Sequence, residues 1–374
     1  MKKIAAISLS LVMFSMLFVS VIPSSADADS TGFDVEFDLK GTHHVTHFDG
    51  PVDQIVVFGY AAALTVLDTN QASKLYASDK YADDAYAEKG LTRDSEEVAN
   101  LSTANVDSIY AFLTQAVHDN ELSIHDAIIL TTMSSPAQTL YNKLTTDAGF
   151  DHVVFYGSMT EYADIIQCVK EIEMILGADG TLHEAMETKL ANINTAVGSA
   201  DKVDAMFVWY SPTSGWGYGN TGSLSVTMIN AAGGNNIGYN SGSTSSIIYD
   251  KSGVVQRLAD SPEAVIFLDS GFTRSYGGTL QQFVDEVMGG NLGKHKLVVS
   301  EHAWNNYCPE SADGLVKMAH VLHPDLIDAD VRVYTAADFE ENSETNIVLY
   351  AGIGIAIIVI AGLAVFLLRG RSTV

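Results

Sequence analysis

The residues best suited to chemistry in this chain are aromatic, and four of them gather in one short segment. Residues 209–218 read WYSPTSGWGY, so aromatic side chains alternate with small and flexible residues. Flat aromatic faces beside glycines suit stacking against a planar or macrocyclic ligand. We expect Trp209 to belong to a strand and its core, and we predict ligand contact for Tyr210, Trp216 and Tyr218.

Further candidates follow from a general property of open α/β sheets, in which ligands bind at the carboxyl ends of the strands. Segments in this position supply the remaining candidate ligand-binding residues, which are Tyr60, Met133, Arg274, Tyr276, Trp304 and Tyr307. The Arg274 guanidinium would pair with an anionic ligand or chelate. The alternative for Arg274 is an ion pair at the surface with one of the many acidic residues.

Metal-binding and catalytic patterns are weak. His43 and His47 would stand about 13 Å apart in an extended chain, too far to share one metal ion, so an incidental role is favoured. His302 would be a metal ligand or, more commonly for a lone histidine, part of a polar surface. Cys168 and Cys308 are the only cysteines and form no CxxC pair. No GxSxG, HExxH or Walker motif is present. We therefore predict a protein that is not an enzyme, with no intrinsic cofactor and no resident metal.

The elements that must position these residues alternate between strands and helices in two successive units. Apolar strands are expected at 55–58, 127–130 and 152–156, and again at 205–209, 264–268 and 296–299. Strands this apolar, separated by helical segments, indicate parallel sheets covered on both faces. We predict an α/β fold with two Rossmann-like lobes, residues 31–158 and 199–336, and we read the glycines at 215–219 as a flexible loop.

Residues 159–198 connect the two lobes. They contain no proline, and apolar residues recur on one helical face. We predict one long helix, which would measure roughly 50 Å at 1.5 Å rise per residue. Asp179-Gly180 leaves open a turn between two helices. A helical connection resists bending, so the predicted motion is a small change in cleft width.

The two ends of the chain indicate its location. Residues 1–26 combine a charged start, an apolar run and small residues at the exit, as a secretory signal peptide does; an uncleaved anchor helix is the alternative. After an acidic linker at 337–346, the apolar run 347–368 is long enough to span a bilayer. Arginines in the tail 369–374 place that tail in the cytoplasm. We predict a single-pass protein of the cell membrane whose main body is extracellular.

The charge of the chain limits its partners. Acidic residues number 46 against 20 basic ones, which gives a formal net charge of −26. Such a body repels nucleic acid and anionic lipid, so we predict no nucleic-acid partner.

Several short motifs occur in an order that resembles a known family. Residues 50–57 (GPVDQIVV), 105–109 (NVDSI) and 125–129 (HDAII) lie in the first lobe, followed by 231–236 (AAGGNN) and a closing helix at 314–326. Across residues 50–327 this order resembles the class III solute-binding proteins of ABC importers. The resemblance implies capture of a ferric chelate, cobalamin or haem, and delivery to an ABC permease.

One departure from the family pattern concerns the permease. The family carries a glutamate on the first helix of each lobe, which pairs with permease arginines, whereas the matching positions here are Leu64 and Val226 or Thr227. Either a nearby acid such as Asp68 replaces them, or docking differs.

Three functions therefore remain, led by a membrane-anchored receptor that captures a metal complex for ABC import. The second is a surface binding or adhesion protein of the same fold that does not dock a permease. The third is an enzyme that acts on a metal complex. The sequence does not name the ligand: the aromatic residues favour a macrocycle, and the shortage of arginine argues against a strongly anionic siderophore.

Overall fold

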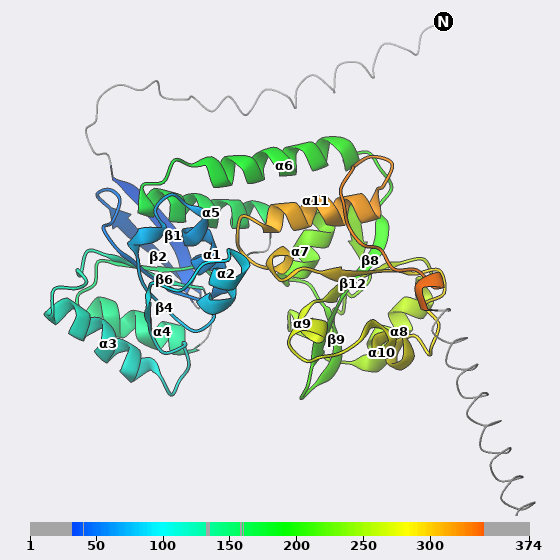
Figure 1. Cartoon of the computed structure of the whole chain (residues 1–374), viewed down its shortest axis with the longest axis horizontal. Helices are drawn as coiled ribbons and strands as arrows, with labels where there is room; N and C mark the ends of the chain where they lie inside the picture. Colours follow the sequence, from blue (N-terminus) through cyan, green and yellow to red (C-terminus); the bar gives the residue numbers. More distant parts are fainter. Residues whose placement is uncertain (1–31, 40, 132–134, 158, 160, 340–374) are drawn as a thin grey trace, which may run out of the picture.

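The computed structural model describes residues 32–39, 41–131, 135–157, 159 and 161–339. They form two α/β lobes that lie side by side, with helices across the top of both (Figure 1). The predicted signal peptide and the predicted membrane span lie outside the described residues. Within those residues, no helix has both the length and the apolar character needed to cross a membrane.

The N-terminal lobe is built on a parallel sheet of strand order β5-β4-β3-β6-β7. Its two central strands are buried along their whole length, because each consists of four apolar residues, IVVF and AIIL. The strands are β3 (Ile55–Phe58), β4 (Leu75–Ser78), β5 (Glu96–Glu97), β6 (Ala127–Leu130) and β7 (His152–Phe155). The helices are α1 (Tyr60–Asp68), α2 (Ala82–Glu88), α3 (Val106–His118) and α4 (Ser135–Asn142), with short helical turns η1 (Ala72–Lys74) and η2 (Lys143–Asp147). The predicted α/β lobe is confirmed.

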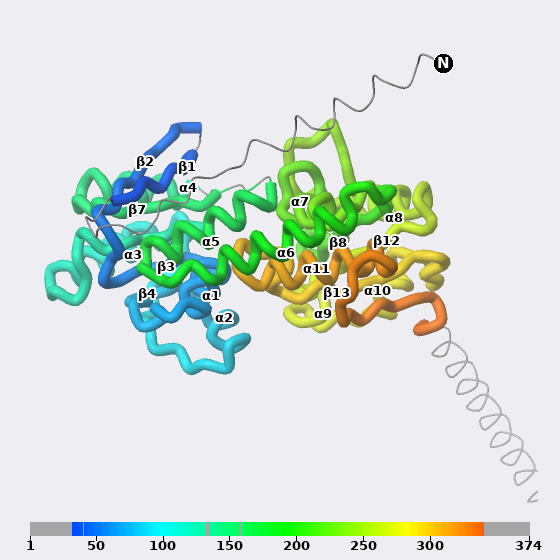
Figure 2. The backbone as a smooth tube through the Cα atoms, turned by 90° about the horizontal axis from the view of Figure 1, so that it is seen from above, coloured from blue at the N-terminus to red at the C-terminus, as the bar shows by residue number. Residues whose placement is uncertain are grey.

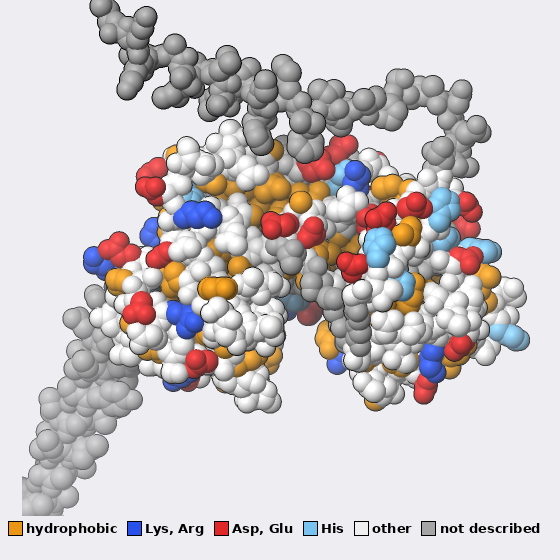
Figure 3. Space-filling view, turned by 180° about the vertical axis from the view of Figure 1, so that it is seen from behind, with side chains coloured by type: hydrophobic (Ala, Val, Ile, Leu, Met, Phe, Trp, Pro, Cys, Tyr) orange, Lys and Arg blue, Asp and Glu red, His pale blue; other side chains and the backbone are white. Residues whose placement is uncertain are grey.

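A separate antiparallel hairpin of β1 (Phe33–Leu39) and β2 (Thr42–Phe48) packs beside β7. Its register places His43 opposite Asp38 and His47 opposite Asp34. The Nδ1 atom of His47 lies 2.6 Å from Asp34 Oδ1. Acidic and histidine side chains gather at this corner of the molecule (Figure 3). Within the described residues, no group of three or more His, Cys, Asp or Glu side chains is arranged to hold a metal ion.

The C-terminal lobe departs from the prediction of a purely parallel sheet. Its order is β11-β9-β8-β12-β13, with β10 also paired to β8. β8 (Val203–Ser211) turns directly into β9 (Gly215–Gly219), and the two strands pair antiparallel. The expected flexible loop at 215–219 is therefore a strand, because a tight turn at 212–214 returns the chain along β8. The other strands are β10 (Gly234–Asn236), β11 (Ile247–Ile248), β12 (Val265–Asp269) and β13 (Lys296–Ser300).

Helices cover this second sheet on both sides, as they do the first (Figure 1). They are α7 (Leu224–Ala231), α8 (Lys251–Asp260), α9 (Gly271–Arg274), α10 (Leu280–Val287), the turn η3 (His302–Asn305) and α11 (Ser311–Leu322). The sheet separates two clusters of buried side chains. One continues into the N-terminal lobe, and the other is enclosed by α8, α9 and α10.

The connection between the lobes is two helices, not the single long helix that we predicted. α5 (Tyr162–Leu176) ends at Gly177, and α6 (Thr181–Val197) starts after Gly180. Both glycines have a positive φ, 67° and 78°, which a residue with a side chain rarely adopts. α5 runs back into the N-terminal lobe, and α6 alone crosses to the C-terminal lobe (Figure 2). The turn at Asp179-Gly180, the alternative left open by the sequence, is the observed one.

The buried Glu173 holds this turn. Its carboxylate accepts hydrogen bonds from the backbone N–H groups of Leu182 and His183, at 3.0 Å each. The Nδ1 atom of His183 lies 2.7 Å from the same carboxylate. An acidic group at the start of a helix also interacts favourably with the helix dipole. Glu173 at the end of α5 thus fixes where α6 begins.

We predict that Glu173→Ala lowers the free energy of unfolding by about 1–3 kcal/mol, because it leaves backbone donors without their acceptor. Urea denaturation followed by circular dichroism measures this. Glu187→Ala, at an exposed position of α6, is the matched control and should change stability by less than about 0.5 kcal/mol. Equal effects of the two substitutions would contradict a special role for Glu173.

Candidate ligand-binding cleft

A cavity of about 590 Å³ lies between the lobes. The N-terminal lobe contributes Thr131 and Gly157, which follow the carboxyl ends of β6 and β7. The C-terminal lobe contributes the end of β8, the segment before α7, the segment before β11 and the segment after η3. Their lining residues are Trp209, Thr221, Gly222, Ser223, Leu224, Thr244, Ser246, Ile247, Asn305, Asn306 and Tyr307. The position matches the usual ligand site of open α/β sheets. A groove between the lobes is visible from behind (Figure 3).

The cavity has hydrogen-bonding groups and an aromatic wall. Trp209 lies against Phe207, with ring centroids 5.0 Å apart. The Nε1 atom of Trp209 and the Oδ1 atom of Asn305 are buried, and neither has a hydrogen-bond partner. Buried polar groups in folded proteins normally do have partners. Within the part of the chain that the structure describes, the residues of this cavity wall therefore include one buried donor and one buried acceptor without a partner.

In the aromatic segment 209–218, the residues that we expected in the core and in the cleft have exchanged places. Trp216 is 2% exposed, and its Nε1 donates a 2.8 Å hydrogen bond to Glu286 on α10. Tyr218 is fully buried beneath the Arg257 guanidinium. Both belong to the core under α8–α10, whereas Trp209, which we assigned to the core, lines the cleft.

The physical reason is the two-residue period of a strand. Met206, Val208 and Tyr210 face the core under α8–α10, so Trp209 must face the other side of the sheet. In the antiparallel register Trp216 pairs with Tyr210 and shares its face. Tyr210 accordingly contacts Trp216, Phe272 and Tyr276 at 4.8, 5.1 and 5.9 Å between ring centroids. Alternation along 205–210 indicates from sequence that Trp209 and Tyr210 face opposite sides of the sheet, and the packing of the sheet decides which side is the cleft.

The other predicted residues are spread over several parts of the structure. Tyr307 lines the cavity, and burial raises the pKa of its phenol. Trp304 is 2% exposed and donates a 3.0 Å hydrogen bond to Glu301, so it forms part of the packing beside α11. Tyr276 is 50% exposed. Met133 lies outside the described residues.

Tyr60 and Arg274 take part in a contact between the lobes. The Tyr60 hydroxyl donates to Glu88, and its ring lies 4.1 Å from that of His302 in the other lobe. Burial and Glu88 together raise the pKa of Tyr60 well above its ordinary value. Arg274 reaches across to Asp84 and Glu88, at 3.4 and 3.6 Å. The predicted alternative of an ion pair therefore describes Arg274 in this structure.

A second ionic group joins the lobes beside the first. Lys89 forms ion pairs with Asp68 of its own lobe and with Glu310 of the other. Burial, reinforced by Glu310, raises the pKa of Asp68 to about 7. A carboxyl pair of this kind shares a proton at neutral pH.

A further cavity of about 580 Å³ borders these ion pairs. Lys89 pairs here with Glu310 and Lys317 with Glu301, and His302 lies 3.5 Å from Glu88. We therefore assign this cavity to the contact between the lobes and the uncharged one to the ligand.

The positions at which the family carries docking glutamates are enclosed. Leu64 is fully buried, and Val226 and Thr227 are 8% and 7% exposed. Asp68, the acid that we considered as a substitute, is committed to Lys89 and Glu310.

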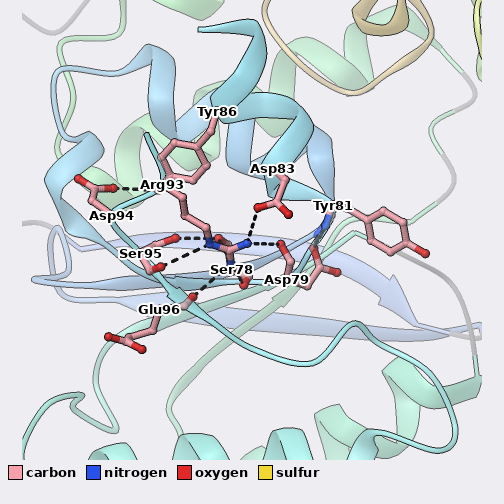
Figure 4. Close-up of polar contacts among 10 residues, drawn as sticks. Ser78, Asp79, Tyr81, Asp83, Tyr86, Arg93, Asp94, Ser95 and Glu96 are labelled. Carbon is pink, nitrogen blue, oxygen red and sulfur yellow. Dashed lines mark hydrogen bonds and ion pairs between the residues drawn. The ribbon is translucent and has the colours of Figure 1, made fainter. Parts of the chain in front are cut away.

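Two residues that sequence reasoning did not single out fix the N-terminal side of the contact between the lobes. The Asp79 carboxylate accepts hydrogen bonds from the backbone N–H groups of Gly59 and Tyr81, at 3.2 Å each, and fixes the turn that presents Tyr60. Burial raises the pKa of Asp79 to about 6. Arg93 binds Asp83 at 2.8 Å and the Ser78 hydroxyl at 3.0 Å, which holds the end of β4 beside it (Figure 4).

Comparison with known proteins supports the fold. No model of a known protein family matches the sequence, and no curated protein is detectably similar to it. Among solved structures, the periplasmic heme-binding protein RhuT from Roseiflexus sp. RS-1 in apo form aligns with a TM-score of 0.54 and 13% identity, over 73% of this chain and 98% of that one.

Two further structures are similar. CeuE of Helicobacter pylori in complex with Ni-His gives a TM-score of 0.54 at 12% identity, over 79% of this chain and 90% of that one. The vitamin B12 binding protein BtuF of Vibrio cholerae gives 0.51 at 17% identity, over 73% and 97%. The predicted resemblance to class III solute-binding proteins is thereby confirmed at the level of the fold.

We predict that acidic residues at the contact between the lobes make stability decrease as the pH rises from about 4 to about 7. The folded protein keeps the Asp68 proton up to about pH 7, whereas an unfolded aspartate releases it near pH 4. The folded form therefore binds more protons in this range, and the free energy of unfolding falls with pH, by at most about 1.4 kcal/mol per unit from one such group. Urea unfolding at several pH values measures the slope.

The variant Asp68→Asn keeps the shape of the protonated acid and should flatten this slope. Asp79 and Asp269, whose pKa values burial raises to about 6, leave part of it in place. Asp53→Asn, at an exposed site, is the control and should keep the wild-type slope. An unchanged slope in Asp68→Asn would show that this carboxyl does not hold the proton.

Proposed function

We propose that this chain is a solute-binding protein that holds one small metal complex in the cleft between its lobes. The observation that carries the proposal is the cavity at the carboxyl ends of β6, β7 and β8, with the Trp209 indole and Asn305 amide available for hydrogen bonding. The similar structures are titled as a periplasmic heme-binding protein, a complex of CeuE with Ni-His and a vitamin B12 binding protein. A ligand would stack on Trp209, and Tyr307 and Asn305 would contact its edge.

We propose further that the protein delivers its ligand to an ABC permease. One similar structure is titled as part of an ABC-type Fe³⁺-hydroxamate transport system. The enclosed positions of Leu64, Val226 and Thr227 favour a second candidate, a binding protein of the same fold that does not dock a permease. If docking occurs, it uses acidic residues other than those of the family pattern.

The proposed location is the outer side of a cell membrane, with residues 1–26 as a signal peptide and 347–368 as a membrane span. Both segments lie outside the described residues, so the proposal rests on their apolar length and flanking charges. The body ends near the core of the C-terminal lobe, where Tyr334 and Phe339 pack with ring centroids 6.4 Å apart. An anchor would therefore continue from the C-terminal lobe.

We predict that at least one complex from a panel of corrinoids, haem and ferric chelates raises the midpoint of thermal unfolding. A ligand present at 100 times its dissociation constant adds about 2.7 kcal/mol to the free energy of unfolding. Differential scanning fluorimetry measures the shift. If all three classes leave the midpoint unmoved, the proposed function fails.

Trp209→Ala should raise the dissociation constant of the ligand found in this way at least tenfold, or about 1.4 kcal/mol in binding free energy, because it removes the aromatic wall of the cleft. Trp209→Phe keeps an aromatic face and should restore part of the affinity. Tyr239→Ala, at an aromatic residue that is 60% exposed and does not line the cavity, is the matched control. Unchanged affinity in Trp209→Ala would place the ligand elsewhere.

We predict that the full chain, produced in a bacterial host, sediments with membranes and stays there in alkaline carbonate. A chain that stops after residue 339 keeps the described body and should appear in the soluble fraction. Retention of the shortened chain on membranes would contradict an anchor at 347–368.

A further inference from the structure

We infer that the cleft selects an electrically neutral metal complex, one that presents amide or hydroxyl groups and a flat apolar face, over an anionic one. This inference rests on the proposed function and narrows its ligand class. It comes from the charges of the residues that surround the cavity and of those that stand near it.

The first observation is the composition of the cavity wall. None of its lining residues is charged: hydroxyl, amide, aromatic and aliphatic side chains and two glycines make up the whole set. A carboxylate or catecholate buried here would lose its hydration without gaining an ion pair, which disfavours its binding.

The second observation concerns the basic residues at the contact between the lobes. Arg274 pairs with Asp84 and Glu88, Lys89 with Asp68 and Glu310, and Lys317 with Glu301. An anion that recruited one of them would have to displace a carboxylate that is already in place. The formal net charge of −26 adds a long-range repulsion against anions.

The third observation is the kind of hydrogen bond that the wall offers. The Trp209 indole donates one, and the Asn305 amide oxygen accepts one. The exposed Thr221, Thr244 and Ser246 hydroxyls can each do either. Such a set matches amides and hydroxyls, which are donors and acceptors at once. Leu224 and Ile247 supply apolar contact for the rest of the ligand.

The test compares ligands that keep the metal and change the charge, using the full chain in detergent. One pair is cyanocobalamin and its derivative in which side-chain amides are hydrolysed to carboxylates. The other is ferrichrome, a neutral ferric trihydroxamate, and the trianionic ferric tris-catecholate of enterobactin. In calorimetric titration, a neutral member should bind at least 100-fold more tightly than its anionic counterpart. Its dissociation constant should change less than twofold between 50 and 500 mM NaCl.

A charge placed in the wall should reverse part of this selectivity. Thr221→Lys should tighten binding of the anionic member of the pair at least tenfold, whereas Thr188→Lys, on exposed α6 away from the cavity, should not. Tighter binding of an anionic member to the wild-type protein would overturn the inference and leave the proposed function intact. No binding of any of the four would overturn the inference, and the proposed function would be overturned with it only if haem also failed to bind.

Discussion

The relative position of the two lobes depends on the turn that connects α5 to α6. Among the described residues, α6 is the only helix that runs from one lobe to the other, and its 17 residues measure about 26 Å at 1.5 Å each. Its direction is set where it begins, by two glycines with positive φ and by the buried Glu173 carboxylate. Because a helix resists bending, a small change in cleft width remains the predicted motion. The proposed receptor would therefore open by small movements at the lobe surfaces.

The facing surfaces of the two lobes contain a charged region and an uncharged region. On one side, Lys89 and Arg274 of different lobes pair with carboxylates across the boundary and hold the lobes together. On the other side, the cavity wall is uncharged and carries an aromatic ring with an unpartnered indole N–H. This separation leaves the binding groups free, since none of them is needed to keep the lobes in contact. Arg274 belongs to the charged region, since it pairs with Asp84 and Glu88 and does not line the cavity.

The sequence predicted much of the architecture and less of the site. Strands such as Ile55–Phe58 and Ala127–Leu130 were predictable because a four-residue apolar run suits a strand buried on both faces. Tyr307 was predictable as a cleft residue from its place after the last strand. The helix break at Gly177 and the strand at Gly215–Gly219 were harder, because glycine marks turns, caps and strands alike.

By itself, the sequence determined the two α/β units, the acidic character of the chain and the short list of aromatic residues among which the cleft residue is found. These features depend on composition and local periodicity, which are present in any stretch of chain. Only the tertiary structure decided that Trp209, and not Trp216, lines the cleft, and that Arg274 pairs with Asp84 and Glu88. The side of the sheet that a strand residue faces follows from the pairing and register of the strand. The ion-pair partner of Arg274 is Asp84, which lies 190 positions away in the sequence. Local sequence contains neither, because both arise only when distant segments pack together.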